Sequence, residues 1–312
     1  MANSPDNPAR PATSEDGSRL KAIGLMLTAL VLFSALDTTG KYLAGAAGLP
    51  VTQISWLRFL GQFTLLLILV PAFGLLTPRQ LFSSTRPGAQ LFRSCLMAAT
   101  TFFNFLALKY LRLDQTITIV FLTPLVVALL AGPLLGEWVG WRRMVAILVG
   151  FLGVLIAVRP GVAGVHPAVL YSVASMLAYA FFMLVTRRIA AHDPPLVTLF
   201  WSMFVGTFLG APFAYAHWVM PDSAAQWLML FSLGILGGTG HYLFILAYRM
   251  APASTVSPFL YLQLLTMVGF GWLVFGDLPD LFTIAGAVIV VSSGVYLIHR
   301  ERIITRPGGG SG

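Results

Sequence analysis

Long apolar stretches separated by short polar segments set the pattern of this chain. Ten such stretches occur, mostly of roughly 18–25 residues, the length of an α-helix that crosses about 30 Å of hydrocarbon. Their apolar positions are continuous rather than alternating, which favours helices over the strands of a membrane barrel. We therefore predict ten transmembrane helices near residues 20–40, 51–76, 88–108, 117–135, 144–158, 168–186, 196–215, 224–248, 251–275 and 281–298.

The same residue types recur at matching places in the two halves of the chain. Ala107-Leu-Lys109 precedes an apolar stretch that ends at Gly136-Glu137, and Ala247-Tyr-Arg249 precedes one that ends at Gly276-Asp277, 140 residues later. Each half holds five predicted helices, an odd number, so the second half must enter the bilayer from the opposite side. The pattern predicts two inverted five-helix repeats around a central cavity, an arrangement typical of transporters.

The repeats define the predicted domain boundaries. Residues 20–160 form the first five-helix repeat and residues 166–300 the second, inverted repeat. Residues 1–19 are polar and rich in Pro, Ser and Asp, so we expect a disordered cytoplasmic tail without a cleavable signal. Residues 301–312 are expected to form a second cytoplasmic tail that ends in a glycine-rich linker.

Composition and charge agree with lipid as the solvent. Hydrophobic residues make up 57% of the chain and charged residues only 10%, against about a quarter charged in soluble domains. Of the 19 Lys and Arg residues, 14 fall in segments predicted to be cytoplasmic, four lie outside and Arg58 lies within a helix. This asymmetry predicts a multi-pass protein of the bacterial inner membrane with both termini in the cytosol, and it explains the net charge without nucleic acid.

Asp37 is the most unusual residue of the first predicted helix. An acid within a membrane helix costs about 2.5–3.5 kcal/mol, so it needs a partner or a function. Lys41 lies one turn later, and Arg58 could meet Asp37 across the first outer loop. These three residues therefore predict either a structural ion pair or a gate or protonation site whose pairing changes during transport.

Several other polar and aromatic residues interrupt the hydrophobic stretches. Pro124 and Pro258 should kink the fourth and ninth helices, and the freed carbonyls then need another partner. Because polar groups in hydrocarbon face the protein interior or water, we expect a cavity walled by the third, fourth, sixth, eighth and ninth helices. The candidate solute-binding residues are Asn104, Thr118, Phe121, Tyr179, His241, Pro258 and Tyr261.

Motifs of other functional classes are missing from the sequence. It contains no zinc-protease, phosphate-loop or nucleophile-elbow motif and no Cys/His cluster, so no metal, cofactor or catalytic residue is predicted. Two rival classes remain at this point, an intramembrane enzyme acting on lipid and a membrane receptor or scaffold without transport. Proton coupling and downhill facilitation also both remain open.

One region resembles a known family. The stretch from Pro124 to Glu137, followed by Gly150-Phe-Leu-Gly153, resembles the EamA-type signature of the drug/metabolite transporter superfamily, and the stretch from Ser257 to Asp277 is similar to its second repeat. Leu264 and Asp277 depart from the proline and glutamate of that pattern. The resemblance implies a ten-helix protein with two inverted repeats.

The resemblance also implies a function. Members of this superfamily export or exchange small metabolites, and the chain looks most like the YddG-type exporters of aromatic and other neutral amino acids. Related branches carry riboflavin, S-adenosylmethionine or nucleotide sugars. The last are disfavoured because an anionic solute calls for bases within the membrane, and only Arg58 is predicted to lie there rather than at a membrane surface. The expected partners are a small solute and membrane lipid, and a monomer that works by alternating access is predicted.

Overall fold

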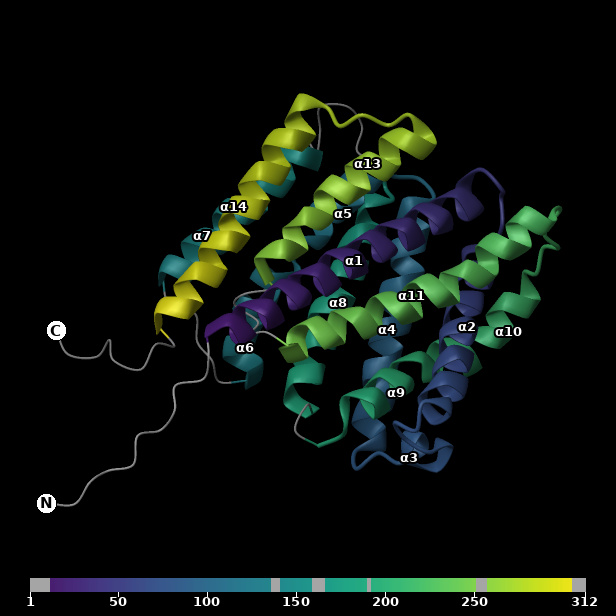
Figure 1. Cartoon of the computed structure of the whole chain (residues 1–312). Helices are drawn as coiled ribbons and strands as arrows, with labels where there is room; N and C mark the ends of the chain where they lie inside the picture. The colour runs from purple at the N-terminus through teal and green to yellow at the C-terminus, as the bar shows by residue number, and fades with distance from the viewer. Residues whose placement is uncertain (1–11, 136–140, 159–165, 190–191, 251–256, 305–312) are drawn as a thin grey trace, which may run out of the picture.

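The computed structural model describes residues 12–135, 141–158, 166–189, 192–250 and 257–304, and within these ranges the chain is all-helical (Figure 1). The helices of the first half are α1 (Ala12–Gly45), α2 (Val51–Ala72), α3 (Pro78–Phe82), α4 (Pro87–Leu108), α5 (Leu113–Val120), α6 (Thr123–Leu135) and α7 (Trp141–Val158). Those of the second half are α8 (Val169–Ile189), α9 (Pro195–Phe208), α10 (Gly210–Ala216), α11 (Ala224–Met250), the 3₁₀-helix η1 (Ser257–Leu262), α13 (Gln263–Phe275) and α14 (Leu281–Ile304).

The lengths and compositions of these helices suit a membrane. Six apolar segments are long enough to cross it, namely α2, α4, most of α1, α8 and α11, and α9 together with α10. Shorter apolar helices occupy Leu113–Val127, Met144–Ala157, Gln263–Phe275 and Leu281–Tyr296. The prediction of an all-helical membrane protein is thereby confirmed, while the number of crossings is taken up below as a proposal.

Two segments that were predicted as single helices consist of two parts. The predicted helix 117–135 divides between α5 and α6, and Pro124 lies in the first turn of α6. Proline has no amide hydrogen to donate and clashes with a preceding helical turn, whereas the first turn of a helix tolerates it. In the second half, Pro258 lies in η1, and the regular helix α13 begins at Gln263.

The two halves of the chain interleave rather than forming separate bundles. The most extensive packing joins α1 to α11, α7 to α14, and α4 to α8, and each pair combines one helix from each half. Glycines allow some of these helices to approach closely: a Cβ atom on Gly234 of α11 would lie 2.7 Å from the Cα atom of Gly61 on α2. Such small-residue contacts are the usual means of close helix packing in membranes.

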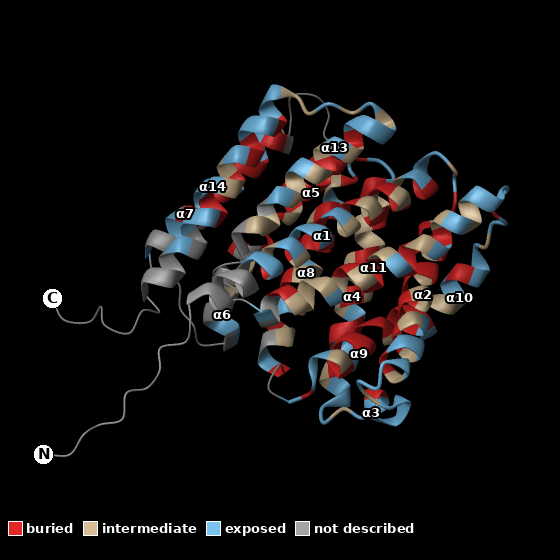
Figure 2. Ribbon diagram, in the orientation of Figure 1, coloured by how far each residue is buried: buried red, intermediate tan, exposed pale blue. Residues whose placement is uncertain are grey.

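Buried residues concentrate in the centre of the bundle, and exposed residues are frequent at its edge (Figure 2). Helices α7 and α14 form one edge, where Leu148, Phe151 and Leu152 expose half or more of their surface. Apolar side chains on the outside are expected where lipid rather than water covers the protein. Helix α1 begins and α14 ends at the same end of the bundle (Figure 1).

Candidate functional site

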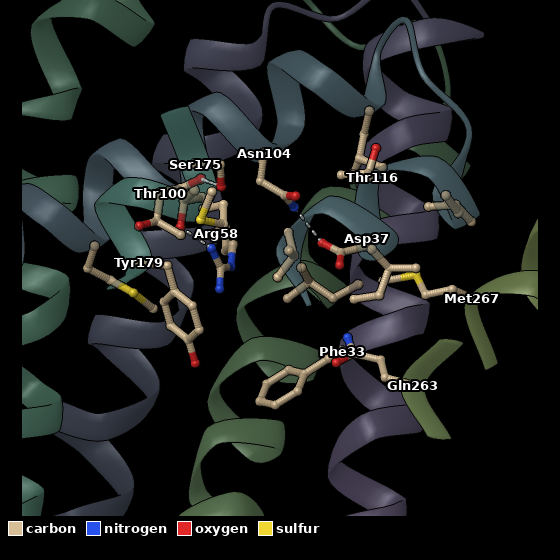
Figure 3. A pocket seen from close by; sticks show the side chains of 18 of the residues that line it. Phe33, Asp37, Arg58, Thr100, Asn104, Thr116, Ser175, Tyr179, Gln263 and Met267 are labelled. Atoms are coloured by element: carbon tan, nitrogen blue, oxygen red, sulfur yellow. Dashed lines mark hydrogen bonds between the residues drawn. The ribbon is translucent and has the colours of Figure 1, made fainter. Parts of the chain in front are cut away.

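A cavity lies between the helices at the centre of the bundle (Figure 3). Helices α1, α2, α4, α5, α8, α11 and α13 contribute to its wall, and its empty volume is about 850 Å³ counted out to its opening. The polar residues of the wall are Asp37, Arg58, Thr100, Thr101, Asn104, Thr116, Ser175, Tyr179, His241 and Gln263.

Helical periodicity places these residues on common faces. On α4, Met97, Thr100, Thr101, Asn104 and Leu108 follow one another at intervals of mostly three or four residues and all line the cavity. Residues at these intervals lie on one side of a helix. Phe33 and Asp37 on α1, and Ser175 and Tyr179 on α8, repeat the four-residue interval.

The acidic residue of the cavity, Asp37, accepts a hydrogen bond from a side-chain amide. Asn104 donates a hydrogen bond of 2.9 Å from its Nδ2 atom to Oδ1 of Asp37 (Figure 3). Among the described residues, no Lys, Arg or His nitrogen lies within 4.0 Å of the Asp37 carboxylate. The predicted ion pair of Asp37 with Arg58 or Lys41 is therefore not formed in this conformation.

The basic residue of the cavity, Arg58, is largely buried, and only part of its hydrogen-bonding capacity is used. Arg58 on α2 is 7% exposed, and its Nη1 atom donates to the hydroxyl of Thr101. Its Nε atom is buried and has no hydrogen-bond partner in the described part of the chain. The rings of Phe59 and Phe105 lie 5.5 and 5.9 Å from the guanidinium carbon. The sequence suggested Arg58 as part of an ion pair or a gate, and in the structure this residue lies in the cavity wall.

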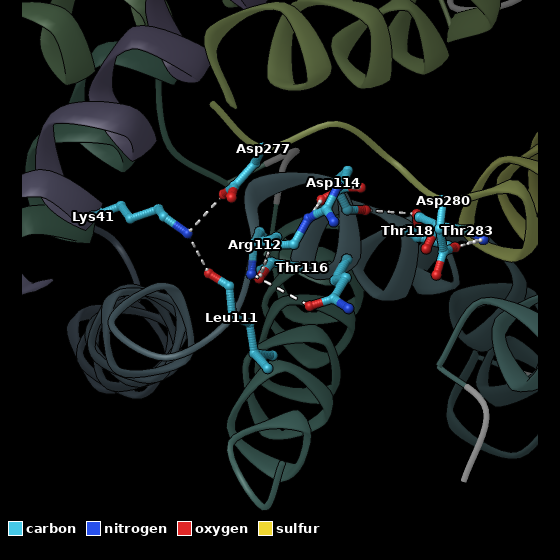
Figure 4. A network of polar contacts seen from close by, with 10 residues as sticks. Lys41, Leu111, Arg112, Asp114, Thr116, Thr118, Asp277, Asp280 and Thr283 are labelled. Carbon is cyan, nitrogen blue, oxygen red and sulfur yellow. Dashed lines mark hydrogen bonds and ion pairs between the residues drawn. The ribbon is translucent and has the colours of Figure 1, made fainter. Parts of the chain in front are cut away.

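Lys41 belongs to a different network (Figure 4). Its Nζ atom donates to the carbonyl of Leu111 at 2.8 Å and lies 3.5 Å from Oδ2 of Asp277. Asp277 reaches this position because Gly276, with a φ of 71°, ends α13 in the left-handed conformation that favours glycine. The pair therefore joins α1 of the first half to the segment after α13 of the second half, which the four-residue spacing from Asp37 did not predict.

Three of the seven predicted solute-binding residues line the cavity, namely Asn104, Tyr179 and His241. Nδ1 of His241 donates to the carbonyl of Gly237 on its own helix at 2.8 Å, and its ring meets Phe33 edge-on at 4.8 Å. Tyr179 stacks on Phe182 at 5.9 Å.

Of the other four predicted residues, Thr118 and Phe121 do not line the cavity. Thr118 is fully buried, and its hydroxyl donates to the carbonyl of Asp114 one turn earlier, so this polar group is satisfied within its own helix. Phe121 is part of the hydrophobic core around α5. Pro258 and Tyr261 lie in η1, and their side chains fall outside the described residues.

Residues that the sequence analysis missed complete the cavity wall. They are chiefly Phe33, Thr100, Thr101, Ser175 and the methionines Met97, Met176 and Met267. Most of them lie three, four or seven residues from Asp37, Asn104 or Tyr179 on the same helix, and this spacing was the available signal, since neighbours on one helix face share one environment. Met267, on α13, had no such signal. Serine and threonine attracted less attention because a hydroxyl can be satisfied within its own helix.

A second buried polar cluster lies between α4, α8 and α9, around Arg93. This arginine is 3% exposed and donates to the side chains of Gln90, Thr186 and Ser202 and to the carbonyl of Thr198. Its guanidinium carbon also lies 4.7 Å from the centre of the Phe182 ring. Every nitrogen of the guanidinium group thus has a partner, which indicates a structural role.

Gln90 links Arg93 to a carboxylate in the loop between α8 and α9. Asp193 accepts hydrogen bonds from Gln90 Nε2 at 2.8 Å, from the amide of Thr85 at 2.8 Å and from the hydroxyls of Thr85 and Ser84. Burial by itself would raise the pKa of Asp193, but the hydrogen bonds from Ser84, Gln90 and Thr85 outweigh it and lower the pKa to about 2. This carboxylate fastens the loop before α4 to the second half of the chain.

Metal binding finds no support in the described residues, because no three His, Cys, Asp or Glu side chains there come close enough together. The cavity instead offers one carboxylate, one guanidinium group, hydroxyls, amides and apolar side chains. Such a set can hold a small organic molecule by hydrogen bonds and charge, with its apolar part against the wall.

Comparison with known proteins gives one family and several relatives. Residues 20–159 and 166–299 each match the EamA-like transporter family. The chain is 28% identical over 287 residues to an S-adenosylmethionine uptake transporter of Rickettsia conorii, covering 91% of this chain and 94% of the relative. It is 28% identical to a riboflavin transporter of Vibrio cholerae, covering 88% and 92% of the two chains.

Further similarities extend this range. A pseudopaline exporter of Pseudomonas aeruginosa is 24% identical and is covered over 97% of its length, with 89% of this chain. A solved crystal structure matches 91% of this chain and 98% of its own with a TM-score of 0.64, and its 19% identity supports the fold alone. None of these relatives is named as an exporter of aromatic amino acids, so the finer resemblance predicted from the sequence finds no support among them.

Proposed function

The chain belongs to the EamA-like transporter family, and from this premise we propose that it carries a small organic solute across the membrane through the central cavity. The proposal rests on the observation that helices from both halves of the chain supply the cavity wall. Helices α1, α2, α4 and α5 come from the first matched half, and α8, α11 and α13 come from the second. A site between two repeats can face either side of the membrane as one half rocks against the other.

The proposed arrangement has ten membrane crossings in two inverted repeats. Six long helices supply six crossings, and the four shorter apolar stretches supply the rest. Both termini are placed in the cytosol of a bacterium, in its inner membrane, because basic residues concentrate on that side. We propose a monomer, since helices of a single chain supply the wall of the cavity.

Thiol labelling tests this orientation. In a Cys95→Ala background, cysteines at Gly48 or Asp222 should react with a membrane-impermeant reagent from outside the cell. Cysteines at Ser83 or His192 should react only after the membrane is opened. The reverse pattern would contradict the placement of the termini and the positive-inside argument.

For the solute, we propose aromatic or other neutral amino acids, exported from the cytosol. The cavity combines an acid and a base with apolar side chains such as Phe33, Met97 and Met176, which suits a molecule with a charged head and an apolar tail. The relatives are named for uptake in one case and export in another, so direction rests on the resemblance alone. The alternative is another metabolite such as S-adenosylmethionine, itself an amino acid derivative, or riboflavin, which has no amino acid group.

The two rival classes, an enzyme acting on lipid and a receptor or scaffold without transport, have less support than transport. The family and the relatives are those of transporters. Proteoliposomes that contain only the purified protein separate transport from both rivals, because neither an enzyme acting on lipid nor a receptor would exchange an aqueous solute.

Counterflow is the direct test of transport. Vesicles loaded with unlabelled L-phenylalanine, S-adenosylmethionine or riboflavin should take up the same labelled solute faster than vesicles without protein or without internal solute. We expect saturable counterflow with L-phenylalanine or S-adenosylmethionine. Counterflow with riboflavin alone would reject the amino acid proposal, and no counterflow with any solute of the panel would reject transport of these metabolites.

A further inference from the structure

The central cavity contains two opposite charges that do not meet in a direct ion pair. Asp37 lies on α1 and Arg58 on α2, and both side chains line the same cavity (Figure 3). They form no ion pair within 4.0 Å, although ion pairs of that length occur elsewhere in the described residues at Lys41–Asp277 and Arg112–Asp114. A charge within a membrane helix is energetically costly, so two charges without direct contact in one cavity require an explanation.

Arg58 has bonding capacity that the protein leaves unused. Its side chain is more than nine-tenths buried, Nη1 donates to Thr101, and the buried Nε atom has no partner among the described residues. An unsatisfied buried donor is destabilising, and more so when it is charged. The planar guanidinium group can donate two parallel hydrogen bonds to a carboxylate.

Asp37 has the complementary capacity. Its Oδ1 atom accepts one hydrogen bond, from Asn104 at 2.9 Å. A carboxylate can accept about four hydrogen bonds, so the group can also receive the N–H donors of an ammonium ion. Lys41, the nearest base along α1, is occupied by Asp277 and the carbonyl of Leu111.

We infer that Asp37 and Arg58 are the two recognition residues of the solute site, and that together they select a zwitterion whose cationic group meets Asp37 and whose carboxylate meets Arg58. The inference rests on the proposed transport function and names the chemical class of its solute. A neutral solute would leave both charges unpaired, an anion would leave Asp37 unpaired, and a cation would leave Arg58 unpaired. Each mismatch leaves a charge unpaired in the cavity, which is how a polar site rejects an incomplete ligand.

The rest of the cavity wall imposes less selection. Three methionines, Met97, Met176 and Met267, line it together with Phe33. Unbranched, polarisable methionine side chains adapt to differently shaped partners. We therefore expect strict selection of the charged head of the solute and tolerance of its apolar side chain.

Binding to matched ligands tests the two roles separately. The probes are L-phenylalanine, phenethylamine, which lacks the carboxylate, and 3-phenylpropionate, which lacks the ammonium group. The wild-type protein in detergent should bind L-phenylalanine at least about tenfold more tightly than either analogue, as expected when one charged hydrogen-bonded contact is lost. L-methionine and S-adenosylmethionine share the ammonium and carboxylate groups of L-phenylalanine and serve as further ligands with different side chains, the second carrying an additional sulfonium charge.

Variants then assign each group of the ligand to a residue. Arg58→Gln should abolish the preference for L-phenylalanine over phenethylamine and keep the preference over 3-phenylpropionate, while Asp37→Asn should do the reverse. Arg79→Gln and Asp222→Asn, on exposed residues outside the cavity, should leave all preferences unchanged. If Arg58→Gln does not yield a monodisperse protein, Arg58→Lys keeps the charge and should bind the zwitterion more weakly with the preference preserved.

Two outcomes overturn the inference. The first concerns a wild-type protein that shows counterflow of riboflavin. If it binds the three phenyl ligands equally, or binds none of the zwitterions, the proposal of transport is retained and the zwitterion site is rejected. The other is unchanged selectivity in both cavity variants. Absence of counterflow with every solute would instead count against the proposed function itself.

Discussion

Two buried arginines of this protein, Arg93 and Arg58, differ in how completely the protein satisfies their hydrogen-bond donors. Arg93 on α4 donates to Gln90, Thr186, Thr198 and Ser202, so each of its nitrogens has a partner. Among the described residues, Arg58 on α2 donates to Thr101 alone, and its buried Nε beside the cavity has no partner. A protein can hide a charge by surrounding it with acceptors, and where it has not done so, the missing acceptor is a candidate for the solute.

The comparison extends to the two acids. Asp193 accepts hydrogen bonds from Ser84, Thr85 and Gln90, whereas Asp37 accepts one from Asn104. The satisfied pair, Arg93 and Asp193, joins the two halves of the chain at one end of the bundle. The unsatisfied pair faces the cavity. Stability and solute recognition are therefore assigned to different charged residues, and mutation should separate them.

The largest loss of stability is expected at Arg93. Arg93→Gln removes a charged donor from at least three acceptors that remain buried, which should lower the free energy of unfolding by about 3 kcal/mol or more. Thermal unfolding of the purified protein in detergent measures the effect. Arg58→Gln, the matched variant, should lose much less stability, and an equal loss in both variants would refute the distinction between the two arginines.

The next effect should appear at Asp193, and it depends on pH. The pKa of this carboxyl is held at about 2 in the folded protein against an ordinary value of 3.8. Its stabilisation, about 2 kcal/mol, is therefore fully present above pH 4 and is lost as the pH falls from about 4 through about 2. Asp193→Asn should destabilise the protein at pH 7, and the difference from wild type should shrink at pH 3. A difference that stays constant between these pH values would show that the carboxylate charge is not responsible.

A smaller effect is expected at the contact between Lys41 and Asp277. The two side chains are 15% and 28% exposed and their charged atoms lie 3.5 Å apart, so Lys41→Met should cost about 1 kcal/mol or less. Exchange of the two residues, Lys41→Asp with Asp277→Lys, should restore part of the stability lost in either single charge change. The control tests the Asp37–Lys41 pair that the spacing on α1 predicted. Asp37→Lys in the Lys41→Asp background should restore none of the lost stability.

The smallest change of stability should come from Asp37→Asn. Asparagine is nearly isosteric and can still accept the hydrogen bond from Asn104, and the loss of an intramembrane charge offsets other costs. We expect unfolding within about 0.5 kcal/mol of wild type together with impaired transport per folded molecule. A strongly destabilised protein would instead favour the structural role first considered for this residue.

Much of the architecture could be predicted from the sequence because lipid imposes simple rules. Continuous apolar stretches identified the helices, and both proline breaks were anticipated near Pro124 and Pro258. The rule that polar groups in a membrane face inward correctly brought Asn104, Tyr179 and His241 to one cavity. Thr118 also faces the interior, since it is fully buried, but it does not line the cavity, because its hydroxyl donates to the carbonyl of Asp114 one turn earlier.

The sequence by itself determined the solvent, the helices, the two halves and the kinds of charge that the membrane encloses, since these depend on composition and local spacing. Only the tertiary structure decided which charge meets which. Lys41 lies one turn from Asp37 but pairs with Asp277 of the other half, and Arg58 donates to Thr101 on α4 rather than forming an ion pair with Asp37. The physical reason is that a long side chain can bond in several directions, and the packing of distant helices determines which partner lies within reach.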